Sequence, residues 1–143
     1  MKVRCMRKED VEQVASIEQV LFSKPWSKKD FLDALSKEEN IYLVAEEQEK
    51  ILGYCGVWGV AGEGQITNVA VREDYQGRGI ATALFTYLFE EGSRKQLYAY
   101  TLEVRVSNQK AIGLYEKLGF FSKGIRKDFY ELPREDAVIM GKE

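Results

Sequence analysis

The chain has 143 residues, enough for one domain with a hydrophobic core, and its 45% hydrophobic and 31% charged residues are typical of soluble globular proteins. A net charge of −2, without a long Lys/Arg run, argues against a nucleic-acid partner. The chain contains no histidine, which excludes Ser-His-Asp and Cys-His nucleophile systems and histidine-containing zinc sites. Catalysis would therefore depend on carboxylates, hydroxyls, amines or the backbone, and we expect no metal site.

The sequence also carries signals about location. The first residues, Met1–Val11, lack the apolar core of a signal peptide, and no stretch approaches the roughly 18 apolar residues of a membrane helix. We therefore expect a cytoplasmic protein that does not bind membranes and that forms a monomer or a weak dimer. Cys5 and Cys55 lie in β-like runs, which predicts two reduced core thiols rather than a disulfide.

Hydrophobic periodicity predicts a mixed α/β fold. Short connections make the middle strands antiparallel, whereas the helix at Ile80 implies a crossover between two parallel strands. We expect a single domain, residues 1–143, with about seven strands, mostly antiparallel around a central parallel pair, and about four helices. In chain order the predicted elements are a strand at Lys2–Met6, helices at Glu9–Phe22 and from Ser27, strands at Ile41–Ala45, Ile51–Val60 and Gln65–Val71, a helix at Ile80–Glu91 ending at Gly92, a strand at Leu97–Arg105, a helix at Asn108–Leu118 ending at Gly119, and strands at Phe120–Arg126 and Ala137–Met140 joined by the polar segment Lys127–Asp136.

The start of the second helix has two local signals. Ser27 and Asp30 have the spacing of a capping box, and Trp26 and Phe31 lie where a hydrophobic staple would pair. Trp26 therefore has a structural role available, beside the alternative that it contacts a substrate.

A glycine turn separates the strand Gln65–Val71 from the helix at Ile80. Gly77 and Gly79 allow the backbone to turn tightly, so that several N–H groups and the positive helix end point at one spot, as a diphosphate requires. The spacing is neither the dinucleotide fingerprint nor a P-loop. By itself the turn also fits a helix entry that binds nothing.

Two further residues are candidates for acid–base chemistry. Strand alternation places Glu103 on the face opposite Leu102 and Val104, near the carboxyl end of its strand, where open α/β sheets bind ligands. Tyr115 shares a helical stripe with Asn108, about two turns away. Taken separately, Glu103 also fits a solvated strand face, and Tyr115 fits core packing.

Together these features resemble a known family. The turn from Gln76 to Ala81 is similar to the Q/R-x-x-G-x-G/A motif of GNAT-type N-acetyltransferases, which bind acetyl-CoA. Within that superfamily the sequence most resembles bacterial ribosomal-protein-alanine N-acetyltransferases, over nearly the whole chain. The other segments that carry the resemblance are Pro25-Trp26-Ser27, Asn68-Val69-Ala70-Val71, Leu102-Glu103-Val104-Arg105, Ser107-Asn108, Leu114-Tyr115-Glu116, Leu118-Gly119-Phe120 and Glu135–Met140.

The resemblance implies direct transfer of an acetyl group from acetyl-CoA to a protein N-terminus, that of a ribosomal small-subunit protein beginning with alanine. It implies that Glu103 is the general base, acting directly or through a water, and that Tyr115 is the general acid. The residues to which it assigns acetyl-CoA binding are Asn68, Val69, Val71, Gln76, Gly77, Arg78, Gly79, Ile80, Ala81 and Asn108.

The chain departs from the family pattern on the acceptor side. The tandem tyrosines usual before the last strand are Phe129-Tyr130 here, and the loop at Glu131–Arg134 is short. With Trp26, these two aromatic residues are the predicted acceptor contacts. Two other functions stay open: acetylation of a small amine, and a non-catalytic acetyl-CoA sensor, against which the presence of both Glu103 and Tyr115 argues.

Overall fold

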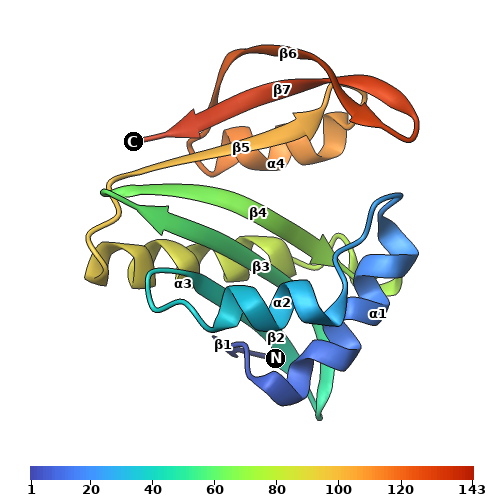
Figure 1. The fold of residues 1–143 in the computed structure, drawn as a ribbon, viewed down its shortest axis with the longest axis vertical. Helices are drawn as coiled ribbons and strands as arrows, with labels where there is room; N and C mark the ends of the chain where they lie inside the picture. Colours follow the sequence, from blue (N-terminus) through green and yellow to red (C-terminus); the bar gives the residue numbers. More distant parts are fainter.

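A computed structural model describes residues 1–143 and shows one mixed sheet in the strand order β1-β2-β3-β4-β5-β7-β6 (Figure 1). Helices α1 and α2 cover one face of the first strands, and α3 covers the other, while α4 packs beneath the last three (Figure 1). The predicted fold class is confirmed. The bounds are β1 (Lys2–Cys5), α1 (Val11–Leu21), α2 (Lys28–Leu35), β2 (Ile41–Glu47), β3 (Lys50–Val60), β4 (Glu63–Val71), α3 (Ile80–Arg94), β5 (Ala99–Arg105), α4 (Gln109–Lys117), β6 (Phe121–Glu131) and β7 (Arg134–Lys142), with short 3₁₀ turns η1 (Lys8–Asp10) and η2 (Glu73–Tyr75).

The second helix begins as its sequence predicts. The Ser27 hydroxyl accepts a hydrogen bond from the Asp30 N–H at 3.2 Å, and the Asp30 carboxylate accepts one from the Ser27 N–H at 2.8 Å. Two otherwise unpaired N–H groups are satisfied by this reciprocal capping box. The Trp26 and Phe31 rings lie 5.1 Å apart, so Trp26 does have the predicted structural contact.

The parallel pair at the centre of the sheet is short. β4 and β5 pair only at their first residues, from Glu63 opposite Ala99 to Gln65 opposite Thr101, and then diverge (Figure 1). The register between β3 and β4 shifts at the same level, because Asn68 lies opposite Gly56 while Ile66 lies opposite Val57. This β-bulge increases the local twist of β4, which turns away from β5. The sheet is thus split along its middle.

Two hydrophobic cores lie on opposite faces of the sheet. The larger one joins α3 and the buried Tyr115 of α4 to inward-facing residues of β2 to β5. The smaller one joins α1 and α2 to the other faces of β2 and β3. The larger core holds both strands that border the split, through Ile66 of β4 and through Leu102 and Val104 of β5. The smaller core holds only β4 of these two strands, through Ala70.

Three sequence-based predictions are wrong in detail. Helix α3 continues through Gly92 to Arg94, and glycine is required there because a Cβ atom would lie 1.8 Å from the Tyr100 hydroxyl. Cys5 is exposed rather than a core thiol, whereas Cys55 is buried as predicted. The polar segment Lys127–Asp136 is mostly strand, since Tyr130 pairs with Glu135 and Glu131 with Arg134 across a tight turn. No helix is both long and apolar enough to span a membrane.

Candidate active site

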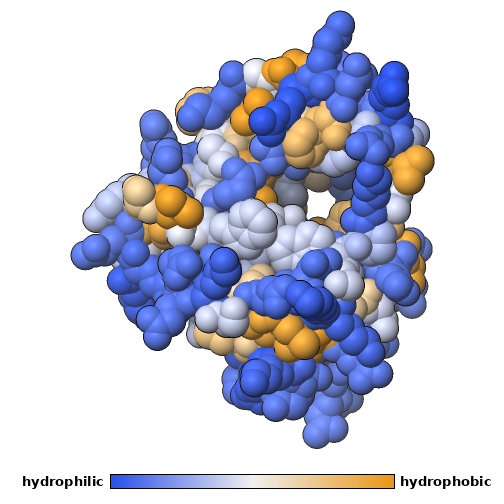
Figure 2. Space-filling model, in the orientation of Figure 1, coloured by the Kyte–Doolittle hydropathy of each residue, from blue (hydrophilic) through white to orange (hydrophobic).

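The split between β4 and β5 contains a cavity of about 690 Å³. In the space-filling view a hollow opens through the molecule at the place where these strands separate (Figure 2). The open sheet edge, α4, the α1–α2 loop and the β6–β7 hairpin form its walls. The predicted site residues that line it are Trp26, Asn68, Val69, Glu103, Asn108, Tyr115, Phe129 and Tyr130, whereas Val71 and the turn Gln76–Ala81 lie outside its lining.

Glu103 enters this cavity from β5. Its Oε1 atom accepts a hydrogen bond from the Gln65 amide at 3.1 Å, and its Oε2 atom lies 3.7 Å from the Arg126 guanidinium. The Thr101 hydroxyl donates to the Gln65 side-chain oxygen at 2.8 Å, which fixes the amide orientation. These two contacts fix the direction of the Glu103 carboxylate in the cavity wall.

Tyr115 of α4 also lines the cavity. The residue is 8% exposed, and its ring packs edge-on against Phe85 and Phe120 at centroid distances of 5.8 and 5.9 Å. Burial raises the pKa of the Tyr115 phenol well above its ordinary value, with a smaller contribution from Tyr130. The phenol therefore keeps its proton across the physiological range, as a general acid must.

Asn108 has a structural role that its sequence context did not reveal. Its side-chain oxygen accepts a hydrogen bond from the Ala111 N–H at 3.2 Å, so that Asn108 is the N-cap of α4. The cap sets the start of the helix that carries Tyr115 two turns later. Asn108 also lines the cavity.

The glycine turn has the geometry of an anion site. Gly77 and Gly79 both have φ near +80°, a conformation that only glycine adopts without strain. Gly79 is the N-cap of α3 and offers no capping side chain, so the first N–H groups of the helix have no partner from the chain. The Gln76 amide donates to the Val71 carbonyl at 3.1 Å, which ties the turn to the end of β4. Arg78 stacks over the Tyr75 ring, 4.9 Å from its centroid.

The β6–β7 hairpin forms the far wall of the cavity. Phe129 and Tyr130 pack edge to face at 5.0 Å, and the Arg105 guanidinium lies over the Tyr130 ring at 4.3 Å. Arg105 also donates to the Leu132 and Pro133 carbonyls, at 3.2 and 2.9 Å. Burial and the nearby Glu103 charge raise the pKa of Tyr130 to about 12. β5 thus supplies Glu103 and also holds the hairpin beside it.

One ion pair connects the two loops at the mouth of the cavity. Lys24 in the α1–α2 loop lies 2.5 Å from Glu131 at the end of β6, and both side chains are exposed. We call this contact the loop bridge. It joins the wall that contains Trp26 to the wall that contains Tyr130, so an ion pair bridges the mouth of the cavity between these two walls.

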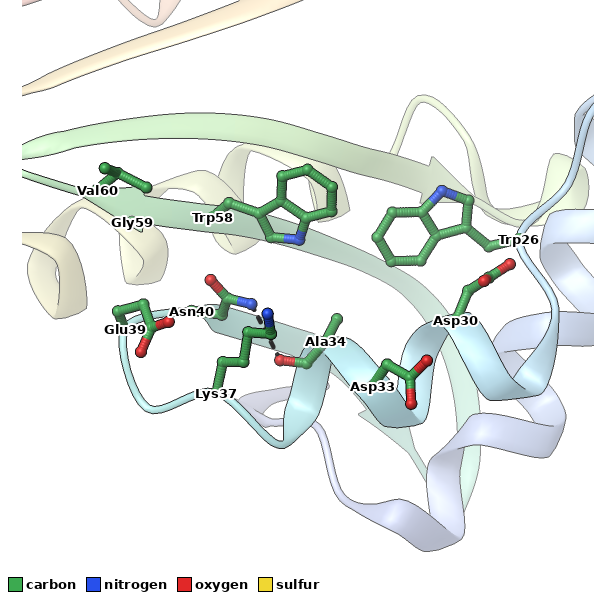
Figure 3. Close-up of a pocket in the computed structure, with 10 residues that line it drawn as sticks. All are labelled: Trp26, Asp30, Asp33, Ala34, Lys37, Glu39, Asn40, Trp58, Gly59 and Val60. Carbon is green, nitrogen blue, oxygen red and sulfur yellow. Dashed lines mark hydrogen bonds between the residues drawn. The ribbon is translucent and has the colours of Figure 1, made fainter.

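A second hollow of about 500 Å³ lies beside the cavity. Trp26 and Trp58 line both hollows, with their rings 6.0 Å apart, and Figure 3 shows them side by side above α2. Three carboxylates and one ammonium group complete this side groove, from Asp30, Asp33, Glu39 and Lys37. Asp30 and Asp33 belong to α2, Lys37 and Glu39 to the α2–β2 loop, and Trp58 to the outer end of β3.

The sequence analysis did not identify Glu18, Trp58 and Gln65, which also line the cavity. Glu18 had a signal, because it stands on the apolar stripe of α1, four residues after Val14 and three before Leu21. A carboxylate on such a stripe is buried against the core and needs an explanation. The sequence carries no such signal for Trp58 and Gln65, because their places in the cavity depend on which strands border the split.

The split sheet, with a glycine turn at the start of the helix that follows β4, is the arrangement of an acetyltransferase fold. The sequence profile of the acetyltransferase (GNAT) family matches residues 11–120, and the chain belongs to this family. Within it, the chain is an N-acetyltransferase similar to proteins named ribosomal protein bS18-alanine N-acetyltransferases.

Two relatives and one of two similar structures support that finer statement. The chain is 42% identical to a Bacillus subtilis (strain 168) protein named as a putative ribosomal protein bS18-alanine N-acetyltransferase, over 96% of this chain and 92% of that protein. It is 35% identical to the ribosomal protein bS18-alanine N-acetyltransferase of Escherichia coli (strain K12), over 92% and 89%. The Escherichia coli ribosomal-protein-S18-alanine N-acetyltransferase structure matches with a TM-score of 0.89, 33% identity and coverage of 99% and 92%. Ard1 from Thermoplasma volcanium, with a TM-score of 0.90, 23% identity and coverage of 99% and 95%, shows the fold alone.

Proposed function

We propose that the protein transfers the acetyl group of acetyl-CoA to the N-terminal α-amine of a ribosomal small-subunit protein beginning with alanine, in the cytoplasm. The observation that carries the proposal is that Glu103 and Tyr115 enter one cavity from different elements. The names of the relatives support the acceptor. A sensor that only binds acetyl-CoA would need neither side chain.

The donor would lie along the open edge of β4. Beyond Gln65 this edge has no strand partner on the β5 side, so main-chain groups near Val69 and Val71 are available to the pantetheine arm. The free N–H groups at the start of α3 would bind the pyrophosphate, together with those of the turn Gln76–Ala81. Asn108 would contact the arm where α4 begins.

The reaction needs a neutral amine, which attacks the thioester carbonyl carbon. An α-amine with a pKa of about 7.7–8.0 is about 10–20% neutral at pH 7, so a base has a modest task. Glu103 would accept the amine proton, directly or through a water, while N–H groups near Asn68 and Val69 stabilise the oxyanion. When the C–S bond breaks, the Tyr115 phenol would give its proton to the CoA thiolate.

The side groove favours a peptide over a small amine as acceptor. A small amine needs only the cavity that contains Glu103, whereas a peptide also needs room for the residues after the first. Trp26 and Trp58 line both spaces, so a chain can lie against one pair of rings from the cavity to the groove. Acetylation of a small amine remains the second candidate, because Phe129 replaces the tyrosine usual at that position.

The test is a panel of acceptors read by mass spectrometry. The protein is incubated with acetyl-CoA and peptides that begin with Ala, Ser, Met or Gly, and with amino sugars, polyamines and amino acids. We expect acetylation of the α-amine of the Ala peptide, and none of the same peptide with a blocked N-terminus. Transfer to small amines alone would contradict the proposed acceptor, and tight acetyl-CoA binding without transfer would indicate a sensor.

Replacement of Gly79 by alanine should weaken acetyl-CoA binding by about fivefold to thirtyfold, because the left-handed conformation costs an L-residue roughly 1–2 kcal/mol. A Cβ atom at Gly79 meets nothing within 4 Å, so only backbone strain is introduced. Calorimetric titration with acetyl-CoA measures the effect. Gly113→Ala is the matched control, since Gly113 lies inside α4 with the same free space and ordinary φ. Equal affinities for the two variants would mean that the turn does not hold the donor.

A further inference from the structure

Glu18 is a buried carboxylate in the wall of the catalytic cavity. It is 4% exposed, and its Oε1 atom accepts a hydrogen bond from the Tyr54 hydroxyl at 2.6 Å. Its Oε2 atom accepts from the Trp26 N–H at 3.2 Å and from the Asn68 amide at 3.4 Å. All three donors are neutral, and none of the ion pairs in the structure includes Glu18.

A buried charge without a counter-ion is unusual, because desolvation of a carboxylate is costly unless a cation or several hydrogen bonds compensate it. Hydrogen bonds from three neutral donors compensate part of this cost at Glu18. The Tyr54 ring, fully buried on β3, also offers no positive charge. The Glu18 carboxylate therefore lies in the cavity wall with hydrogen-bond donors around it and with no cation of the chain paired to it.

Only two carboxylates line the cavity, and they differ in their partners. Glu103 has the Arg126 guanidinium at 3.7 Å and the Gln65 amide at 3.1 Å, so its charge is already partly balanced. Glu18 has no such balance. An incoming cation would therefore gain more from Glu18 than from Glu103.

The site at Glu18 also has unused hydrogen-bonding capacity. A carboxylate offers about four lone-pair positions, and three donors reach Glu18, so one position is left. The side-chain oxygen of Asn68 is buried and accepts no hydrogen bond. Asn68 is 6% exposed and lines the same cavity. Two oxygen acceptors thus lie beside the place where the substrate must enter.

We propose that Glu18 binds the acceptor as its ammonium ion, and that Asn68 assists through its unpaired oxygen. The inference rests on the proposed function, since about 80–90% of an α-amine is protonated at pH 7 and must be received in that form. Glu18 then has a binding role and Glu103 a proton-accepting role. The two carboxylates approach the amine from α1 and β5, on separate walls of the cavity.

A purely structural role for Glu18 would have a different effect on the binding of acceptors. Its bond to the Trp26 N–H ties the α1–α2 loop to the sheet, so loss of Glu18 could displace Trp26 without any effect on a charge. Such a displacement would weaken the binding of every acceptor to the same degree. The binding of an ammonium instead requires that the loss depends on the charged group of the ligand.

The test compares two peptides that differ only in the α-amine. One begins with alanine, and the other begins with a propanoyl group, which has the same carbon skeleton without nitrogen. Each is titrated into the protein saturated with CoA, so that no transfer occurs, and tryptophan fluorescence is recorded. The readout is specific because the chain has two tryptophans and both line the cavity.

We expect the wild-type protein to prefer the amino peptide by about tenfold or more at pH 7, as hydrogen bonds to charged groups generally give. Glu18→Gln should remove most of this preference, whereas Glu103→Gln should keep most of it. The Glu18→Gln variant is nearly isosteric. Its new amide nitrogen can donate to the Tyr54 hydroxyl, while the amide oxygen keeps the hydrogen bonds from the Trp26 N–H and the Asn68 amide. Tyr54→Phe is the control, because it removes a donor to Glu18 and leaves the carboxylate.

Three results would overturn the inference: no preference in the wild-type protein, an unchanged preference in Glu18→Gln, or a preference lost in Glu103→Gln alone. The wild-type measurement stands even if the variant fails to fold. Failure of the proposed function has another signature, because the acceptor panel would then show transfer to a small amine only. In that case the same comparison uses that amine and the alcohol of the same skeleton.

Discussion

Replacement of Tyr115 by phenylalanine is expected to lower kcat by about 10²–10⁴-fold, the usual contribution of a positioned proton donor. The ring contacts with Phe85 and Phe120 do not involve the hydroxyl, so the core should keep its packing. The affinity for acetyl-CoA should stay close to that of the wild-type protein, because the lost group acts on the leaving thiolate. Steady-state kinetics with the Ala peptide, together with calorimetric titration of acetyl-CoA, measure both quantities.

Tyr98→Phe is the control for this experiment. Tyr98 is 71% exposed and precedes β5, so its hydroxyl has no part in the cavity. The control variant should turn over like the wild-type protein. Equal turnover in the Tyr115 variant would remove this phenol from the chemistry, and a matching loss of acetyl-CoA affinity would assign it to binding.

Replacement of Glu103 by glutamine should lower kcat by about 10²-fold at pH 7, with a defect that shrinks as pH rises. Below the α-amine pKa of about 7.7–8.0 most of the acceptor is protonated, and the wild-type protein gains from its base. Above that pKa most of the amine is neutral without help, so the two rates approach each other. The ratio of kcat values for the wild-type and variant proteins, measured between pH 6.5 and 9, is the observable (about one unit either side of the amine pKa).

The Arg126→Gln variant distinguishes the contribution of the Glu103 carboxylate from that of the neighbouring cation. This change removes the cation that lies 3.7 Å from Glu103 and leaves the carboxylate and its Gln65 contact in place. We expect a smaller loss of turnover than in Glu103→Gln. A defect of Glu103→Gln that is the same at every pH would instead mean that the side chain holds the cavity wall through Gln65.

Local patterns in the sequence predicted most of the fold. The capping box at Ser27 and the stripes of α1 and α3 depend only on neighbouring residues, and they lie where the spacing places them. The predicted end of α3 was wrong because Gly92 lies inside the helix, where the Tyr100 hydroxyl leaves no room for a Cβ atom. This contact forms only when β5 joins the sheet, so the local sequence does not reveal it. The polar Lys127–Asp136 segment was not predicted as strand, since its pairing with β7 comes from register and not from apolar alternation.

The candidate site was predictable to the extent that a motif carried it. Glu103 and Tyr115 belong to segments that resemble the family, and the structure brings both to one cavity. Their assigned roles remain predictions. Trp58 and Gln65 could not be found because they reach the cavity only through the split of the sheet. Glu18 could have been found, since its position on the α1 stripe marks it as a buried charge.

The loop bridge has a consequence for how an acceptor arrives. The ion pair between Lys24 and Glu131 completes a ring of protein around the cavity. While it is formed, the middle of a long polypeptide cannot enter that ring. A free chain end can pass through the ring, so the formed ion pair favours entry of a terminus over entry of an internal segment. Because the two side chains are exposed, salt screens their attraction and the ring opens readily. The ion pair is therefore strong enough to bias which part of a chain enters and weak enough to break when the chain leaves.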